Sequence, residues 1–153
     1  TPEWYNEPPT SELALYVTAQ AIQNSARAGE FAATKTAQAQ MLERLKARIG
    51  VMGNLYFEEE IRDTLGIDNL INQVVGTRVV GQLIGHRISK KKSVAMGDKV
   101  QTWVMLELPL GPANQILRDQ IEANEAMALE ARKSKAYRDM NEMLDKDELF
   151  AID

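Results

Sequence analysis

The residues of this chain that could do chemistry are few, and they do not combine into a catalytic or metal-binding pattern. There is one histidine, His86, and no cysteine, which removes disulfides, thiolate nucleophiles and sulfur-ligated metals. A packed or surface histidine is the expected role of His86, because metal sites and triads need further partners. Glu58, Glu59 and Glu60 are consecutive, so on a helix they point about 100° apart and cannot converge on one ion. We therefore expect no enzyme activity, no metal and no cofactor.

A basic run is the strongest charge feature. Lys90, Lys91 and Lys92 fall in a predicted loop between two strands, close to Arg87. Three lysines in a loop are most often simply solvated, but they are also possible surface contacts to lipid headgroups or to an acidic partner, at roughly 1 kcal/mol per charge near an anionic surface. The net charge of −4 and the lack of a concentrated basic face argue against nucleic acid as a partner.

Length and composition indicate one globular domain. A chain of 153 residues with 44% hydrophobic and 26% charged residues buries enough surface for a core without disulfides. No run approaches the roughly 18 apolar residues that a membrane-spanning helix needs. The elements that position the side chains must therefore come from ordinary helix and strand patterns.

Strand and helix patterns predict an α+β fold. Residues 13–21 alternate with a period of two, which indicates a strand. Asn24 and Ser25 can cap a helix that runs to Ile49, and Gly50 supplies its end. Short helices broken around Gly66 follow. The expected buried stripe of the first helix consists of Phe31, Thr34, Gln38, Met41, Leu42, Leu45 and Ile49.

Two longer strands follow, at residues 77–88 and 100–108, with residues 89–99 as the loop and Gly97-Asp98 as the turn. Together with the first strand they predict a small three-stranded, mostly antiparallel sheet packed by helices. Trp103 and Met105 lie opposite an equally apolar face, which suggests that both faces of this hairpin are covered.

A long C-terminal helix is expected from Gly111-Pro112 to about residue 146, on the order of 50 Å. Part of it should project and be held by charge pairs such as Arg118 with Glu122, or by another chain. The predicted organisation is thus an entry arm at residues 1–12, a core at 13–111, and this helix with an apolar tail at 112–153.

The first residues, Pro-Glu-Trp-Tyr-Asn-Glu-Pro-Pro, predict an extended arm, because proline fixes φ and cannot join a central ladder. Two large aromatics between prolines carry enough apolar area to anchor on something. With the long helix, the tail and the two-faced hairpin, this is more contact surface than a monomer needs, which favours a homo-oligomer. The predicted oligomer interface consists of Trp4, Tyr5, Pro8, Pro9, Trp103, Tyr137, Met140, Leu144 and Phe150.

The order of these features resembles the twenty-kilodalton bacterial outer-membrane lipoprotein family, which includes a flagellar lipoprotein. The matching positions are Pro2, Trp4, Tyr5, Pro8 and Pro9, the Leu-Tyr-Val at 15–17, the helix at 26–49 and residues 80–108. The resemblance implies a periplasmic protein without catalytic activity, anchored to the outer membrane by a lipid upstream of Thr1. It further implies a ring or disk around a flagellar motor, in contact with other envelope or flagellar ring proteins.

Two alternatives remain open. The chain could be a periplasmic binding module that holds peptidoglycan or a small ligand in a groove, using Arg87, His86 or Trp103. It could also be a ring component of a secretion system. The first alternative predicts a monomer with a pocket, whereas assembly in a ring predicts oligomers.

Overall fold

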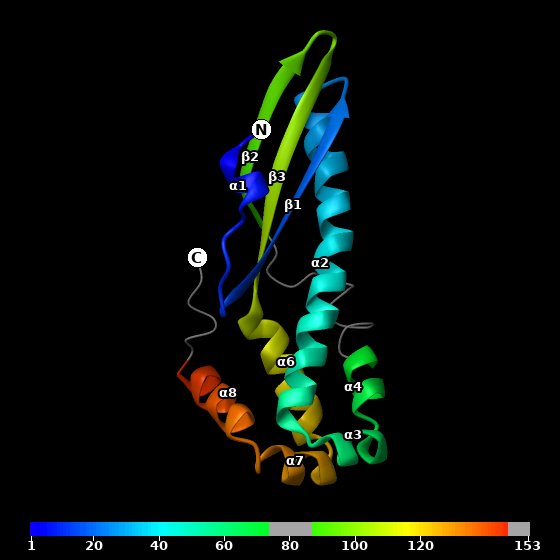
Figure 1. Cartoon of the computed structure of the whole chain (residues 1–153), viewed down its shortest axis with the longest axis vertical. Helices are drawn as coiled ribbons and strands as arrows, with labels where there is room; N and C mark the ends of the chain where they lie inside the picture. The colour runs from blue at the N-terminus through cyan, green and yellow to red at the C-terminus, as the bar shows by residue number, and fades with distance from the viewer. Residues whose placement is uncertain (74–86, 147–153) are drawn as a thin grey trace. The chain divides into compact units, whose positions relative to one another are not determined.

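The computed structural model describes residues 1–73 and 87–146 (Figure 1), and the chain forms two compact units. The first unit contains residues 1–43 and 85–108, and the second contains residues 44–84 and 109–153. This division differs from the predicted one, in which residues 13–111 form a single core. The elements in chain order are α1 (Glu3–Asn6), β1 (Ala14–Gln23), α2 (Ala26–Tyr56), α3 (Glu59–Leu65), α4 (Ile67–Gln73), β2 (Arg87–Met96), β3 (Lys99–Pro109), α6 (Leu110–Glu122), α7 (Glu125–Ala131) and α8 (Lys135–Asp145).

The first unit is built on a three-stranded antiparallel sheet in the order β1-β3-β2, which confirms the predicted α+β class. β2 and β3 form a hairpin whose register runs from Arg87 opposite Glu107 to Met96 opposite Lys99, with a bulge at Ser89. Gly97 opens the turn with φ +64°, a conformation that favours glycine, so the Gly97-Asp98 turn is also as predicted.

The two faces of the sheet carry different partners. A Cβ added at Gly29 of α2 would lie 2.4 Å from the Thr102 hydroxyl, so the N-terminal part of α2 packs closely on that face. Tyr16, Thr18 and the other even-numbered residues of β1 lie on the opposite face, where the Thr18 hydroxyl donates a hydrogen bond to the Tyr5 carbonyl at 3.1 Å. The entry arm therefore contacts the sheet on the side away from α2 (Figure 1). As a result β3 is buried on both faces within its own chain, with Trp103 4% and Val104 0% exposed.

Two predictions for this unit were wrong. The entry arm is not extended throughout, because residues 3–6 form one helical turn, α1, after Pro2. Lys90, Lys91 and Lys92 lie in strand β2 and not in a loop. Pairing with β3 outweighs the low strand preference of lysine, since strand preference depends strongly on tertiary context. The part of the predicted second strand at residues 77–86 lies outside the described residues.

Helix α2 is longer than predicted and buries Met41, Leu45 and Ile49 of the predicted stripe, but not Phe31. It continues past Gly50 to Tyr56, and Phe31 is 65% exposed. The predicted stripe fails at its N-terminal end because the sheet accepts only small side chains there. The buried positions recur every four residues along one side of the helix, at Gly29, Ala33, Ala37, Met41, Leu45, Ile49 and Gly53.

The glycines of α2 provide a matched pair for testing this close approach. Alanine at Gly29 would collide with the buried Thr102, whose hydroxyl is already bonded to Ser93 at 2.8 Å, and we expect a loss of about 1–2 kcal/mol of unfolding free energy. Alanine at Gly50 meets nothing within 4 Å, so we expect a gain of about 0.5–1 kcal/mol from helix propensity. Urea unfolding followed by circular dichroism measures both. Equal effects of the two substitutions would contradict the packing of α2 on the sheet.

The second unit is helical. Gly66 ends α3 in the left-handed region, with φ +67°, so the predicted break between two short helices is confirmed. The predicted long C-terminal helix is wrong, because three helices occupy residues 110–145. Asn124 caps α7 by accepting a hydrogen bond from the Met127 amide, and Ser134 caps α8 by accepting one from the Tyr137 amide. The long element of this fold is α2.

Candidate functional site: an exposed edge strand

The most unusual surface of the first unit is strand β2. Within the described residues it pairs only with β3, and all ten of its residues are exposed. The outer side of such a strand presents backbone N–H and C=O groups that can pair with another extended segment. The strand is longer than the five or six residues that are usual in globular proteins. β2 can therefore accept an added strand.

The charge of β2 is of one sign. It contains Arg87, Lys90, Lys91 and Lys92 and no acidic residue. Within the first unit, the Lys91 ammonium lies 3.2 Å from the Glu30 carboxylate of α2, in an exposed pair that contributes little to stability. Lysines on an edge strand discourage pairing with unsuitable partners while leaving the edge open to an acidic one.

Apolar side chains accompany these charges. Ile88, Val94 and Met96 are 36%, 41% and 48% exposed, and Phe31 of α2 lies near this strand. A pocket of about 350 Å³ is lined by Ile88, Phe31 and other α2 residues, among them Thr34. The Lys35 ammonium lies 4.8 Å from the centre of the Phe31 ring. The surface thus combines apolar area with positive charge.

The opposite face of the sheet holds a buried carboxylate. Glu107, with 6% of its side chain exposed, accepts hydrogen bonds from the Tyr16 hydroxyl at 2.6 Å and from the Arg87 Nε at 2.5 Å. The hydrogen bond to Glu107, followed by burial, raises the pKa of Tyr16 above its ordinary value. Arg87 is consequently engaged with Glu107 and does not project freely from β2.

We expect Glu107→Leu to lower the unfolding free energy by about 1–3 kcal/mol, because the Tyr16 hydroxyl then lacks its acceptor. Half of the Arg87 side chain is exposed and can turn to water, which limits the loss. Glu107→Leu combined with Tyr16→Phe should recover part of it, since no buried donor is then left unpaired. Thermal unfolding of the single and double variants measures this. A double variant that is no more stable than Glu107→Leu alone would contradict the network.

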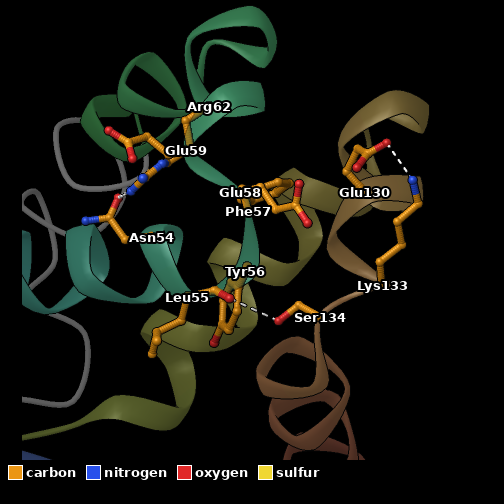
Figure 2. Close-up of a pocket in the computed structure, with 10 residues that line it drawn as sticks. All are labelled: Asn54, Leu55, Tyr56, Phe57, Glu58, Glu59, Arg62, Glu130, Lys133 and Ser134. Carbon is orange, nitrogen blue, oxygen red and sulfur yellow. Dashed lines mark hydrogen bonds and ion pairs between the residues drawn. The ribbon is translucent and has the colours of Figure 1, made fainter.

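One of the pockets in the second unit has a volume of about 340 Å³ (Figure 2). Its polar side chains largely bond to one another. The Arg62 guanidinium donates to the side-chain oxygen Oδ1 of Asn54, and the Lys133 ammonium lies 3.0 Å from a Glu130 carboxylate oxygen. The Ser134 hydroxyl donates to the backbone carbonyl of Leu55 at 3.0 Å. Side chains paired in this way hold helix ends together and offer little to a ligand.

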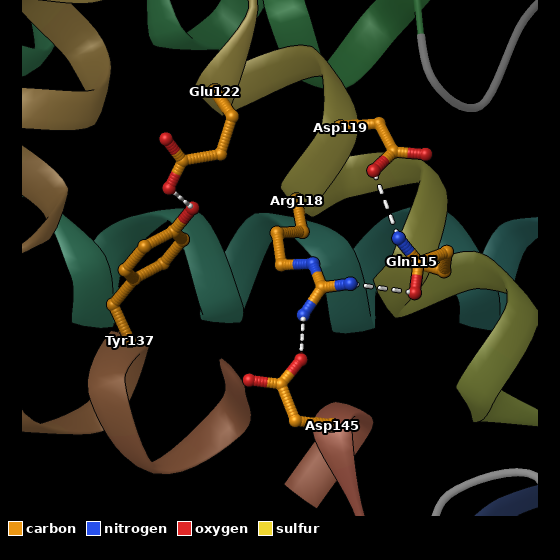
Figure 3. A network of polar contacts seen from close by, with 6 residues as sticks. All are labelled: Gln115, Arg118, Asp119, Glu122, Tyr137 and Asp145. Atoms are coloured by element: carbon orange, nitrogen blue, oxygen red, sulfur yellow. Dashed lines mark hydrogen bonds and ion pairs between the residues drawn. The ribbon is translucent and has the colours of Figure 1, made fainter. Parts of the chain in front are cut away.

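Polar contacts also join α6 to α8 in the second unit (Figure 3). The Arg118 guanidinium donates to the Asp145 carboxylate at 3.0 Å and to the side-chain oxygen Oε1 of Gln115 at 2.9 Å. The buried Tyr137 hydroxyl donates to Glu122 at 3.0 Å, and Glu122 also accepts from Arg132. The predicted pair of Arg118 with Glu122 is therefore replaced by contacts between different helices.

Alkaline pH is expected to destabilise the second unit. Burial raises the pKa of Tyr56 to about 12, and burial together with the hydrogen bond to Glu122 raises that of Tyr137. Because both folded values lie above the ordinary 10.0, the stabilisation is complete below pH 10 and is lost as the pH rises through the folded values. Melting temperatures should be constant from about pH 7 to 9 and fall above 10, less steeply in Tyr137→Phe. An identical fall in that variant would contradict the assignment.

The predicted interface residues differ in how far they are exposed. Trp4, Tyr5 and Pro8 are partly exposed and Pro9 is exposed, so they remain available to a partner. Phe150 and His86 lie outside the described residues. Four others are buried inside the chain and cannot contact a neighbour in this conformation, because they form its own cores: Trp103, Tyr137, Met140 and Leu144.

The exposed apolar residues of β2 were missed by the sequence reasoning. Val94 and Met96 fell in the predicted loop at residues 89–99, where single apolar side chains do not indicate a binding surface. A signal was present, since Ser-Val-Ala-Met before Gly97-Asp98 continues strand-like composition up to the turn.

Other classes of site find no support in the residues described. Those residues include no group of acidic or histidine side chains placed to hold a metal ion. No helix formed by them has the length and apolar character needed to span a membrane. The comparisons with known proteins found no matching family model, no similar curated protein and no similar solved structure.

Proposed function

We propose that this chain is a non-enzymatic structural module that assembles with copies of itself. The observation that supports this most directly is β2, an edge strand of ten exposed residues with three partly exposed apolar side chains. A long, partly apolar edge is a liability for a free monomer and is useful in an assembly, where a neighbour covers it. The partly exposed arm residues Trp4 and Tyr5 supply a second contact of the same kind.

The setting that we propose is the periplasmic side of the bacterial outer membrane, in a ring or disk associated with a flagellar motor. The resemblance of the Pro-x-Trp-Tyr-x-x-Pro-Pro entry to the lipoprotein family supports this setting. A lipid attached upstream of Thr1 would provide the anchor. One acyl chain binds a membrane only marginally, so many copies in a ring would hold far more firmly than one.

A binding module for peptidoglycan or a small ligand is less well supported. Of the three residues that it would use, Arg87 is bonded to Glu107 and Trp103 is buried, while His86 lies outside the described residues. The pocket of the second unit shown in Figure 2 is lined by side chains that are largely paired with each other.

The oligomeric state tests the assembly. We expect the purified chain to form oligomers whose size rises with concentration in sedimentation velocity, and the double variant Val94→Glu with Met96→Glu to sediment as a monomer. Leu129→Glu is the matched control, since Leu129 is 62% exposed in the second unit and should leave assembly unchanged. A wild-type chain that stays monomeric at high concentration would overturn the proposal.

A further inference from the structure

We propose that the partner of the β2 edge is residues 147–153 of a second copy, added to the sheet as a fourth strand. This inference rests on the proposed self-assembly and names the segment that makes it. Those residues lie outside the part of the chain that the structure describes. Their charge, apolar content and length are taken from their sequence, Asp-Glu-Leu-Phe-Ala-Ile-Asp.

Charge complementarity is the first argument. β2 has four basic residues and no acidic one, and residues 147–153 have three acidic residues and no basic one. Arg87 is paired with Glu107 and Lys91 with Glu30, so Lys90 and Lys92 carry most of the positive charge that an added strand would meet. The net charge of the chain is −4, so a run of lysines is an exception within an acidic protein. Opposite charges across a strand pair stabilise it, and like charges directly opposite destabilise it.

Symmetric pairing of two β2 strands is disfavoured by the same rule. An antiparallel pair that matches residues 87–96 of both copies end to end places Lys91 directly opposite Lys92. Both lysines would then face a like charge at close range, twice over because of the two-fold symmetry. In this end-to-end register the edge therefore disfavours its own copy and favours an acidic strand.

Apolar content and length also agree. Residues 147–153 carry Leu149, Phe150 and Ile152 among their acids, and large apolar residues of this kind suit a half-buried strand. β2 offers Ile88, Val94 and Met96 as exposed apolar contacts. Seven residues in extended form reach about 23 Å, against about 33 Å for the ten of β2. The segment is thus long enough to cover most of the edge.

Peptide binding provides the first test. A chain that stops after Lys146 should bind a fluorescent peptide of residues 145–153 in an anisotropy titration, more weakly at high salt. The Lys90→Glu with Lys92→Glu variant of that chain should lose roughly tenfold or more in affinity. A peptide with Asp147→Lys and Glu148→Lys should recover affinity for that variant and lose it for the parent. Equal binding of a scrambled peptide would overturn the inference.

Cysteine crosslinking tests the full chain, and it has no background because the chain lacks cysteine. Val94→Cys combined with Phe150→Cys should give disulfide-linked dimers and higher species on oxidation. The control pair, Leu129→Cys with Phe150→Cys, should give few. Crosslinks confined to single chains would show that the segment docks within its own copy, and absent crosslinks would exclude it from the edge; either result overturns the inference.

The two levels of the proposal fail in different ways. If the chain stopping after Lys146 still forms the wild-type oligomers, the tail is not the partner and self-assembly through another surface stands. If the full chain is monomeric while the peptide binds β2 in the expected charge-dependent manner, self-assembly fails and the edge is a site for acidic segments of another protein. That second outcome also overturns the assignment of the partner to a copy of this chain.

Discussion

Tyr137→Ala is expected to lower the unfolding free energy by about 3–5 kcal/mol, the range for removing a large aromatic from a core. Tyr137 is 0% exposed, and its ring meets Tyr56 edge to face with centroids 5.2 Å apart and planes at 77°. Such a pair adds about 0.5–1.5 kcal/mol beyond burial. Because Tyr137 lies in α8 and Tyr56 ends α2, the substitution should loosen several helices of the second unit together.

Tyr137→Phe is the matched control. It keeps the ring and removes only the hydroxyl that donates to Glu122 at 3.0 Å, so the expected loss is about 0.5–1.5 kcal/mol. Urea unfolding followed by circular dichroism gives the two values. Hydrogen exchange should locate the effect of Tyr137→Ala in α6 and α8, with the strands of the first unit nearly unchanged. Similar losses for alanine and phenylalanine would show that the ring is not packed as described.

Local rules predicted the elements whose signals are local. β1 follows from period-two alternation. The helix end at Gly66 and the turn at Gly97 follow from glycine, because both positions have a positive φ that other residues adopt only at a cost. The class of sheet and the Gly97-Asp98 turn were predicted, but the second predicted strand at residues 77–88 overlaps β2 only at 87–88, and most of β2 lies in the predicted loop at 89–99. The confirmed features depend on a few consecutive residues, so a single sequence is enough to find them.

The C-terminal region failed because its breaks depend on tertiary packing. No glycine or proline lies between Pro112 and residue 146, so a single helix is the simplest interpretation. The caps Asn124 and Ser134 were visible as residue types, but such residues also occur within helices. Burial of Met127 and Tyr137 against other helices decides between the two possibilities, and it depends on residues far apart in the sequence.

The candidate site was predicted only in part for the same reason. Lys90, Lys91 and Lys92 were predicted as possible surface contacts in a loop, yet their position on an edge strand depends on pairing with β3, which no lysine pattern reveals. Similarly, Phe31 was expected to be buried because it is large and apolar. The sheet instead requires Gly29 and Ala33 at the close approach, which leaves Phe31 65% exposed.

Trp103→Ala is the second substitution with a large expected effect, again about 3–5 kcal/mol, this time in the first unit. Trp103 is 4% exposed at the centre of the sheet, on the face that the entry arm contacts. The prediction separates two roles for this residue. As a core residue it governs the stability of the single chain, whereas as an interface residue it would affect mainly the oligomer.

Trp103→Phe refines the test, because the buried indole Nε1 has no hydrogen-bond partner within the described structure. An unpaired buried donor is unfavourable by about 1–3 kcal/mol, so phenylalanine relieves that penalty while losing some buried area. We expect the two effects to offset, leaving the variant within about 1.5 kcal/mol of the parent. Urea unfolding followed by circular dichroism compares the parent with Trp103→Ala and Trp103→Phe, because both variants lack the indole at this site.

Substitutions in β3 and in β2 should have different effects on stability and on assembly. Trp103→Phe should leave the oligomer distribution in sedimentation velocity unchanged, whereas Val94→Glu with Met96→Glu should abolish oligomers with little loss of stability, because those side chains are 41% and 48% exposed. Stability and assembly would then depend on different strands of one hairpin, β3 for the core and β2 for the partner. A Trp103→Phe chain that folds normally but no longer assembles would reverse these assignments.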